Sequence, residues 1–162
     1  MASYTQIVPY RRSGSMNKED VKHIIVHCAY TPRTMDIGVK DIDRWHRAKG
    51  WLGCGYHLVI RRDGTLEYGR PLTRTGAHVR SQNKTSIGIC LIGGMNSDKT
   101  GAQINYTDEQ YKSLKNLIDE LRWEHFPDAT VKGHTDFDKG KTCPNFDAEL
   151  WYNTGEIVST IN

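Results

Sequence analysis

The sequence lacks the features that mark several classes of protein. It has no run approaching ~20 apolar residues, so we expect no stable insertion into a membrane. Its first residues contain no apolar core of signal-peptide length, which predicts synthesis in the cytoplasm without a signal peptide. The formal charge of +3 is far from the basic excess of nucleic-acid-binding domains, so we expect no nucleic-acid partner. This mild charge is compatible with an anionic substrate or surface.

Cysteine is scarce, and its spacing shows no pairing pattern. The four cysteines are Cys28, Cys54, Cys90 and Cys143. None forms the Cys-x2-Cys pair that structural zinc sites commonly use. Cys28 and Cys90 lie in apolar runs, where a free cysteine behaves as a small buried hydrophobe. We predict that all four are reduced, and a chain of 162 residues can bury enough surface to fold without disulfides.

The hydrophobic pattern predicts a single α/β domain at residues 21–162, with a central mixed β-sheet flanked by helices, after an irregular lead-in at residues 1–20. The nearly continuous apolar run at the first strand is typical of a strand buried on both faces. We expect strands at residues 23–28, 56–60, 65–68, 86–92 and 129–132. We expect helices at residues 39–49, at residues 108–124 and after Asp147.

Turn and cap residues support several of these boundaries. Asp63-Gly64 between two expected strands favours a hairpin with a type I′ turn. Thr107 and Gln110 form a capping-box pattern at the start of the long helix. Gly50 is a typical residue for the end of the preceding helix.

Residues 133–146 form the stretch that is richest in side chains suited to metal binding or catalysis. This loop carries an imidazole, a cation and a thiol, at His134, Lys141 and Cys143. Imidazole and thiolate are preferred zinc ligands, and a catalytic zinc needs three protein ligands and one open position. His27 ends one expected strand and His134 follows another, so the two imidazoles can meet at one edge of the sheet. For the histidines without such a setting we expect packing or surface roles, and these are His23, His46, His57 and His125.

The order of several short motifs resembles a known family. It is similar to the zinc-dependent N-acetylmuramoyl-L-alanine amidases of the bacteriophage T7 lysozyme type, which share their fold with peptidoglycan recognition proteins. The matching stretches are Ile25-Val26-His27-Cys28, Trp45-His46, Gly50-Trp51-Leu52, Gly55-Tyr56-His57, Arg62-Asp63-Gly64-Thr65, Gly69-Arg70, Gly76-Ala77-His78, Ser86-Ile87-Gly88, Leu91-Ile92-Gly93-Gly94 and Cys143-Pro144-Asn145-Phe146-Asp147. The resemblance covers about residues 21–152, nearly the whole chain. The lead-in and the residues between Ala77 and Ser86 depart from the phage enzyme.

The resemblance implies a role for each matching residue. The implied zinc ligands are His27, His134 and Cys143. Tyr56 and Lys141 stand at the family's catalytic positions, and His78 and Asn83 resemble positions that line the substrate groove. The alternative for Tyr56 is an aromatic side chain that packs on the sheet.

The function implied by the resemblance is zinc-dependent hydrolysis of the amide between N-acetylmuramic acid and L-alanine in peptidoglycan. We expect a monomer that acts on the cell wall after release or delivery. One alternative is a module that binds peptidoglycan without cutting it, although such modules are expected to lack the zinc cysteine. A second alternative is a regulator that acts through protein contacts.

Overall fold

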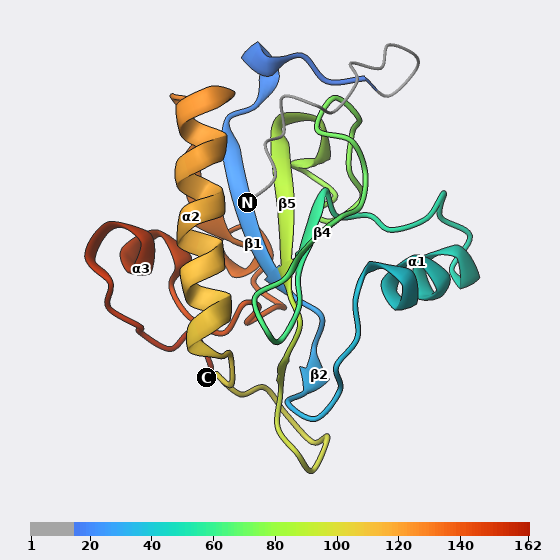
Figure 1. The fold of residues 1–162 in the computed structure, drawn as a ribbon, viewed down its shortest axis with the longest axis vertical. Helices are drawn as coiled ribbons and strands as arrows, with labels where there is room; N and C mark the ends of the chain where they lie inside the picture. The colour runs from blue at the N-terminus through green and yellow to red at the C-terminus, as the bar shows by residue number, and fades with distance from the viewer. Residues whose placement is uncertain (1–14) are drawn as a thin grey trace.

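The computed structural model describes residues 15–162, which form a mixed five-stranded sheet (Figure 1). Its strands are β1 His23–Cys28, β3 Leu58–Ile60, β4 Leu66–Tyr68, β5 Ser86–Leu91 and β7 Thr130–Gly133. They lie in the order β4-β3-β5-β1-β7, and all neighbours are parallel except the β3-β4 hairpin. A small parallel sheet pairs β2 Thr31–Pro32 with β6 Gly94–Met95. The predicted α/β fold with a central mixed sheet is confirmed.

Three helices accompany the sheet in the described part of the chain, and all three were predicted. They are α1 Val39–Ala48, α2 Asp108–Glu124 and α3 Ala148–Thr154, with short 3-10 turns η2 Lys18–Asp20, η3 Asn83–Thr85 and η4 His134–Asp136. The capping box is present, because Thr107 Oγ1 accepts from the Gln110 amide and Gln110 Oε1 accepts from the Thr107 amide. Gly50 follows α1 with a φ of 90°, as the expected helix end requires.

The two faces of the sheet have different coverings. On one face, Ile24 and Val26 of β1 pack in the main core with the apolar stripe of α2, which lies alongside β1 in Figure 1. The opposite face carries a smaller cluster that includes Ile42 of α1 and Cys90 of β5. His27 is paired with Cys90 in the β1-β5 register. Since paired residues of neighbouring strands point to the same face, His27 lies on the face away from α2.

The hairpin prediction is correct, but the predicted turn type is wrong. The Gly64 amide donates to Arg61 O, and the Arg61 amide donates to Thr65 O, which leaves a three-residue loop. A type I′ turn needs positive φ at both central residues, and here Gly64 has a φ of 87° while Asp63 does not lie in the left-handed region. The geometry is that of a type I turn followed by a glycine bulge. The side chain of Asp63 stabilises it by accepting from the Thr65 amide at 2.9 Å.

Most of the expected N-terminal lead-in, residues 1–14, lies outside the described residues. Met16 is only 5% exposed and belongs to the main core, and the Met16 amide donates to Thr73 O. The domain boundary expected at residue 21 stays a prediction, and packing against the sheet begins a few residues earlier.

Each of the four cysteines is free, as predicted. Among the described residues, the helices are all too short or too polar to cross a lipid bilayer.

Candidate metal centre

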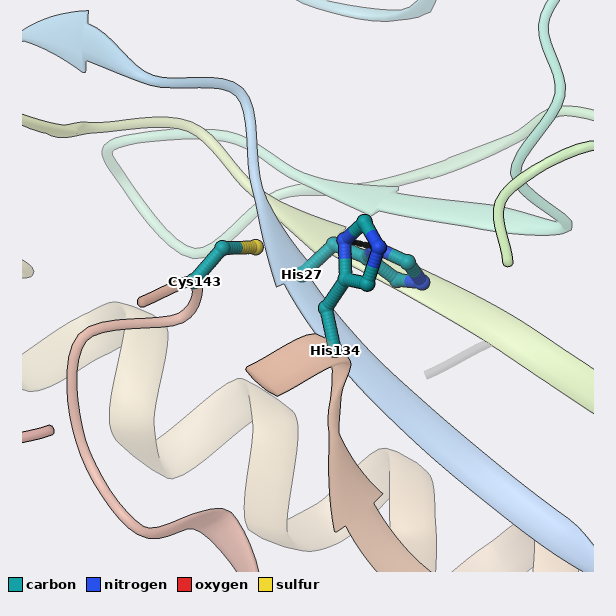
Figure 2. A group of neighbouring side chains, drawn as sticks. All are labelled: His27, His134 and Cys143. Carbon is teal, nitrogen blue, oxygen red and sulfur yellow. Dashed lines mark hydrogen bonds between the residues drawn. The ribbon is translucent and has the colours of Figure 1, made fainter. Parts of the chain in front are cut away.

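Sheet register brings two of the predicted ligands together. Val26 of β1 is paired with Gly133 of β7 in a parallel ladder, so the next residues, His27 and His134, lie opposite each other. Their Nδ1 atoms are 3.2 Å apart, although 107 positions separate them in the sequence. Figure 2 shows both rings beside the sulfur of Cys143, which reaches them from the loop after η4. Donor atoms of the three side chains all lie within 4.8 Å of one another.

The backbone around Cys143 holds its sulfur in place. The Cys28 amide donates to Cys143 Sγ at 2.9 Å, and the Thr135 amide donates to Cys143 O at 2.9 Å. Burial raises the pKa of the Cys143 thiol well above its usual range. A bound cation would therefore be needed to release its proton, and the amide of Cys28 already points a hydrogen-bond donor at the thiolate that results.

The donor set fits a zinc ion. Two nitrogen ligands of one tetrahedral zinc lie roughly 3.3 Å apart, given Zn–N bonds of about 2.0–2.1 Å, and the His27 and His134 nitrogens are 3.2 Å apart. Burial lowers the pKa of His27 well below its usual value, and burial also lowers the pKa of His134. Both imidazoles are therefore neutral near pH 7, which is the form that binds metal. Two imidazoles and one thiolate leave one position open for chemistry.

A cavity of about 680 Å³ opens beside these three residues. Tyr56 and Lys141 both line it, together with His134 and Cys143. The charged side chains of its lining are two lysines, Lys49 and Lys141, and within residues 15–162 no carboxylate side chain lines it. The cavity therefore favours a substrate with electron-rich or anionic groups.

The two predicted catalytic residues come from different segments of the chain and line the same cavity. The ring of Tyr56, just before β3, is 5.0 Å from the ring of His27. Burial raises the pKa of the Tyr56 hydroxyl well above its usual range, so the hydroxyl is protonated near pH 7 and can donate a hydrogen bond. Lys141 is exposed on the ligand loop, where its amide donates to Asp138 O. Their catalytic roles stay predictions.

The two predicted groove residues do not line this cavity. His78 lies beside His27, with its Nδ1 atom 2.8 Å from His27 Nε2. Asn83 Oδ1 accepts from the backbone amides of His78 and Val79, at 2.8 and 2.9 Å. The contacts of both residues are with the protein itself, and their expected contact with substrate stays a prediction.

Two further histidines, His57 and His46, make the packing contacts expected of them. His57 is 1% exposed, accepts from the Gly88 amide and lies 2.7 Å from Arg74 O. Burial lowers its pKa to about 4. His46 Nδ1 accepts from the Gly55 amide, which fixes the loop before Tyr56, and His46 also lines the cavity, which the sequence did not predict.

Sequence reasoning missed several residues that line the cavity. Trp45 and Lys49 of the α1 region reach it, and so does Tyr30, which follows β1 with a φ of 58°. The i, i+4 spacing of Trp45 and Lys49 was a usable signal, since it places both on one side of a helix. Nothing local to Tyr30 marks it as a cavity residue.

Comparison with known proteins agrees with the motif order. A family model described as N-acetylmuramoyl-L-alanine amidase matches residues 17–146. The endolysin of Enterobacteria phage K11 is 41% identical over 143 residues, which covers 88% of this chain and 93% of the phage protein. The endolysin of Escherichia phage T7 is 38% identical over 143 residues, with the same two coverages of 88% and 93%.

Solved structures agree with these sequence matches. The endolysin amidase LysCS from Clostridium intestinale URNW superposes with a TM-score of 0.66 at 29% identity, over 85% of this chain and 84% of that one. Bumblebee peptidoglycan recognition protein SA has a TM-score of 0.71 at 20% identity, over 94% and 92% of the two chains, and so shares the fold. From its sequence and its fold, this chain belongs to the N-acetylmuramoyl-L-alanine amidase family, with the T7-type phage endolysins among its relatives.

Proposed function

We propose that this protein is a zinc-dependent amidase that hydrolyses the bond between N-acetylmuramic acid and L-alanine in bacterial peptidoglycan. Membership of the amidase family supports the reaction and the substrate class. The observation that carries the zinc dependence is the cluster of His27, His134 and Cys143, whose donor atoms lie within 4.8 Å of one another. We assign these three residues as the zinc ligands and residues 21–162 as the amidase domain.

In the proposed reaction, the metal and the protein side chains have different tasks. An amide is a poor electrophile and water is a poor nucleophile near pH 7. A zinc ion held by the three ligands supplies a Lewis acid and makes water a better nucleophile near neutral pH. The protein has to bind the glycopeptide in the cavity, hold the scissile carbonyl and manage protons at the leaving amine.

Lys141 is the residue that we assign to charge stabilisation. Hydrolysis of an amide places negative charge on the carbonyl oxygen of the substrate. Lys141 lines the cavity beside Cys143 and presents a cation to that oxygen. A preorganised contact of this type is usually worth a few kcal/mol in the transition state.

Tyr56 is the residue that we assign to hydrogen bonding and proton movement. It lines the same cavity, with its ring 5.0 Å from that of His27. Its hydroxyl stays protonated near pH 7, because burial raises its pKa. A neutral hydroxyl can donate to the developing oxyanion or to the leaving amine, and such proton transfers are typically worth a factor of 10²–10⁴ in rate.

The chain's relatives also support a place of action. The proteins from phages K11 and T7 are named endolysins, a term for enzymes that act on the cell wall. We propose the same for this chain, as a monomer that reaches the wall after release or delivery.

A peptidoglycan-binding module is the main competing function. Such a module would need the cavity but not a complete set of metal donors. Here all three donors are present, and the Cys28 amide is directed at the sulfur of Cys143. We therefore favour catalysis, and a regulator acting through protein contacts remains the third class.

Product analysis tests the proposal. Purified peptidoglycan is digested with the wild-type protein and with Cys143→Ala as the matched control, and the products are identified by mass spectrometry. We expect free stem peptides with a new L-alanine amino terminus and intact glycan chains, from the wild type alone. New reducing sugar ends would mean a glycosidase. Binding to the wall without any released product would favour the binding module.

A further inference from the structure

His78 occupies a niche directly behind His27. Its Nδ1 atom is 2.8 Å from His27 Nε2, and the two rings meet edge to face with centroids 4.9 Å apart. On the other side, His78 Nε2 is 3.2 Å from Ser86 Oγ. The niche depends on two glycines, because a Cβ atom at Gly76 or Gly88 would lie 2.7 Å from the ring of His78.

The contacts from Gln82 through Ser86 and His78 to His27 form a series of hydrogen bonds. The direction of each bond follows from the carbonyl of Gln82, where the series ends. Ser86 Oγ is 2.6 Å from Gln82 O, which is a backbone carbonyl and can only accept. The single hydroxyl proton of Ser86 is therefore directed at Gln82 O. Ser86 Oγ must accept from His78 Nε2, which carries the ring proton.

The same reasoning fixes the proton on His27. With its proton on Nε2, a neutral His78 has a lone pair on Nδ1. His27 Nε2 must then donate to His78 Nδ1 across the 2.8 Å contact. A neutral His27 is left with its lone pair on Nδ1, the atom that faces His134 Nδ1 at 3.2 Å. This series of hydrogen bonds thus selects the Nε2-protonated tautomer of His27, whose Nδ1 lone pair can bind a metal between His27 and His134.

We propose that His78, held by Ser86, is a positioning residue that fixes the orientation and tautomer of His27, so that His27 coordinates through Nδ1. This deepens the proposed function, since it concerns the same metal site. It also gives His78 a role different from the substrate contact expected from the sequence. Both of its ring nitrogens have protein partners, and its backbone amide is bound by Asn83.

The physical reason for such a residue is general. Metal-bound histidines usually donate their second N–H to an oriented acceptor, and removing that acceptor typically weakens metal binding by 10–100-fold. The usual acceptor is a carboxylate, a carbonyl or water. Here the acceptor is a second imidazole, which is itself oriented by a serine.

Substitution of His78 tests the proposal through metal binding. His78→Phe keeps a planar ring but removes the acceptor, whereas His78→Asn places a carboxamide oxygen near the position of Nδ1. We expect about 10–100-fold weaker zinc binding for His78→Phe and recovery of most of that loss in His78→Asn. His23→Phe is the control, since it makes the same change at the other end of β1. Zinc affinity is measured by competition with a chromophoric chelator, and the Co²⁺ absorption spectrum reports the ligand geometry.

A second measurement uses the wild-type protein, and it tests the proposed tautomers of His27 and His78 even if His78→Phe does not fold. Two-bond ¹H–¹⁵N correlations of the wild-type, metal-free protein identify the protonated nitrogen of each histidine. We expect the proton of His27 on Nε2 and that of His78 on Nε2. A proton on His27 Nδ1 would overturn the proposal, as would a folded His78→Phe protein that binds zinc as tightly as the wild type.

These readouts do not depend on the reaction that is catalysed. If the protein released no stem peptide but His78→Phe still weakened zinc binding, the amidase function would fail and the role of His78 would stand. If stem peptides were released normally by His78→Phe at wild-type zinc affinity, the role of His78 would fail and the amidase function would stand.

Discussion

At the scale of single residues, the proposed function separates metal binding from catalysis. His27, His134 and Cys143 supply the donor atoms, and Tyr56 and Lys141 line the cavity next to them. Neither of the latter two is needed to complete the donor set. Their substitution should therefore change the rate of the reaction more than it changes metal content or folding.

Lys141→Ala and Tyr56→Phe test this separation. We expect each to keep about one zinc per chain and a near-normal melting temperature, while kcat falls by roughly 10²-fold through loss of a transition-state contact. Lys139→Ala is the control, because it removes an exposed lysine of the same loop. Full activity in either variant would remove that residue from the mechanism. Joint loss of zinc and stability would mean that the residue is structural.

The residue types at the site were readable from the sequence, but their partners were not. A histidine at a strand end and a His-Cys loop are local patterns, so the three side chains were predicted to lie together, and the structure has them as neighbours; their role as zinc ligands stays a prediction. The hydrogen bond from the Cys28 amide to Cys143 Sγ depends on where a distant loop returns to β1. The contact between His78 and His27 likewise joins residues 51 positions apart, and no spacing rule predicts it.

At the scale of elements, the loop of residues 133–146 that carries His134 and Cys143 is held between two other segments of the chain, one at Thr160 and one at Gly94. The Thr160 amide donates to Asn145 O at 3.0 Å, and Thr160 Oγ1 donates to Thr142 O at 2.6 Å. From the other side, Asn145 Nδ2 donates to Gly94 O at 2.8 Å. These bonds bracket Cys143, so the C-terminal segment should help to place its sulfur.

Removing one hydroxyl tests the contribution of that segment. In Thr160→Val the carbonyl of Thr142 loses its donor, at a cost of about 1 kcal/mol, and we expect roughly fivefold weaker zinc binding. Thr160→Ser should restore the affinity, because it keeps the hydroxyl. Thr154→Val is the matched control, since Thr154 Oγ1 donates to Leu150 O within α3, away from the loop. Equal zinc affinities in Thr160→Val and Thr154→Val would contradict the prediction.

The elements themselves were largely predictable, because their signals are local. The capping box at Thr107 set the start of α2, and the apolar run at residues 23–28 set β1 within its observed bounds. The prediction of a type I′ turn at Asp63-Gly64 was wrong, because the same dipeptide also suits a glycine bulge. The length of the loop decides between the two geometries.

At the scale of the whole molecule, the site is a product of sheet topology. The parallel pairing of β1 and β7 places His27 against His134, and β5 beside β1 carries Ser86 into the niche of His78. The α2 face of the sheet is filled by the main core. The opposite face is left for the ligands and the cavity, which gives this fold a rigid support for a metal site that would be open on one side.

The central claim is that this face of the sheet holds one catalytic zinc through His27, His134 and Cys143. Metal analysis of the purified protein tests it most directly, by inductively coupled plasma mass spectrometry of the wild type and of the double variant His27→Ala, Cys143→Ala. We predict about one zinc per chain in the wild type and almost none in the double variant, because a single remaining imidazole cannot retain the ion. Stoichiometric zinc in the double variant would contradict the assignment.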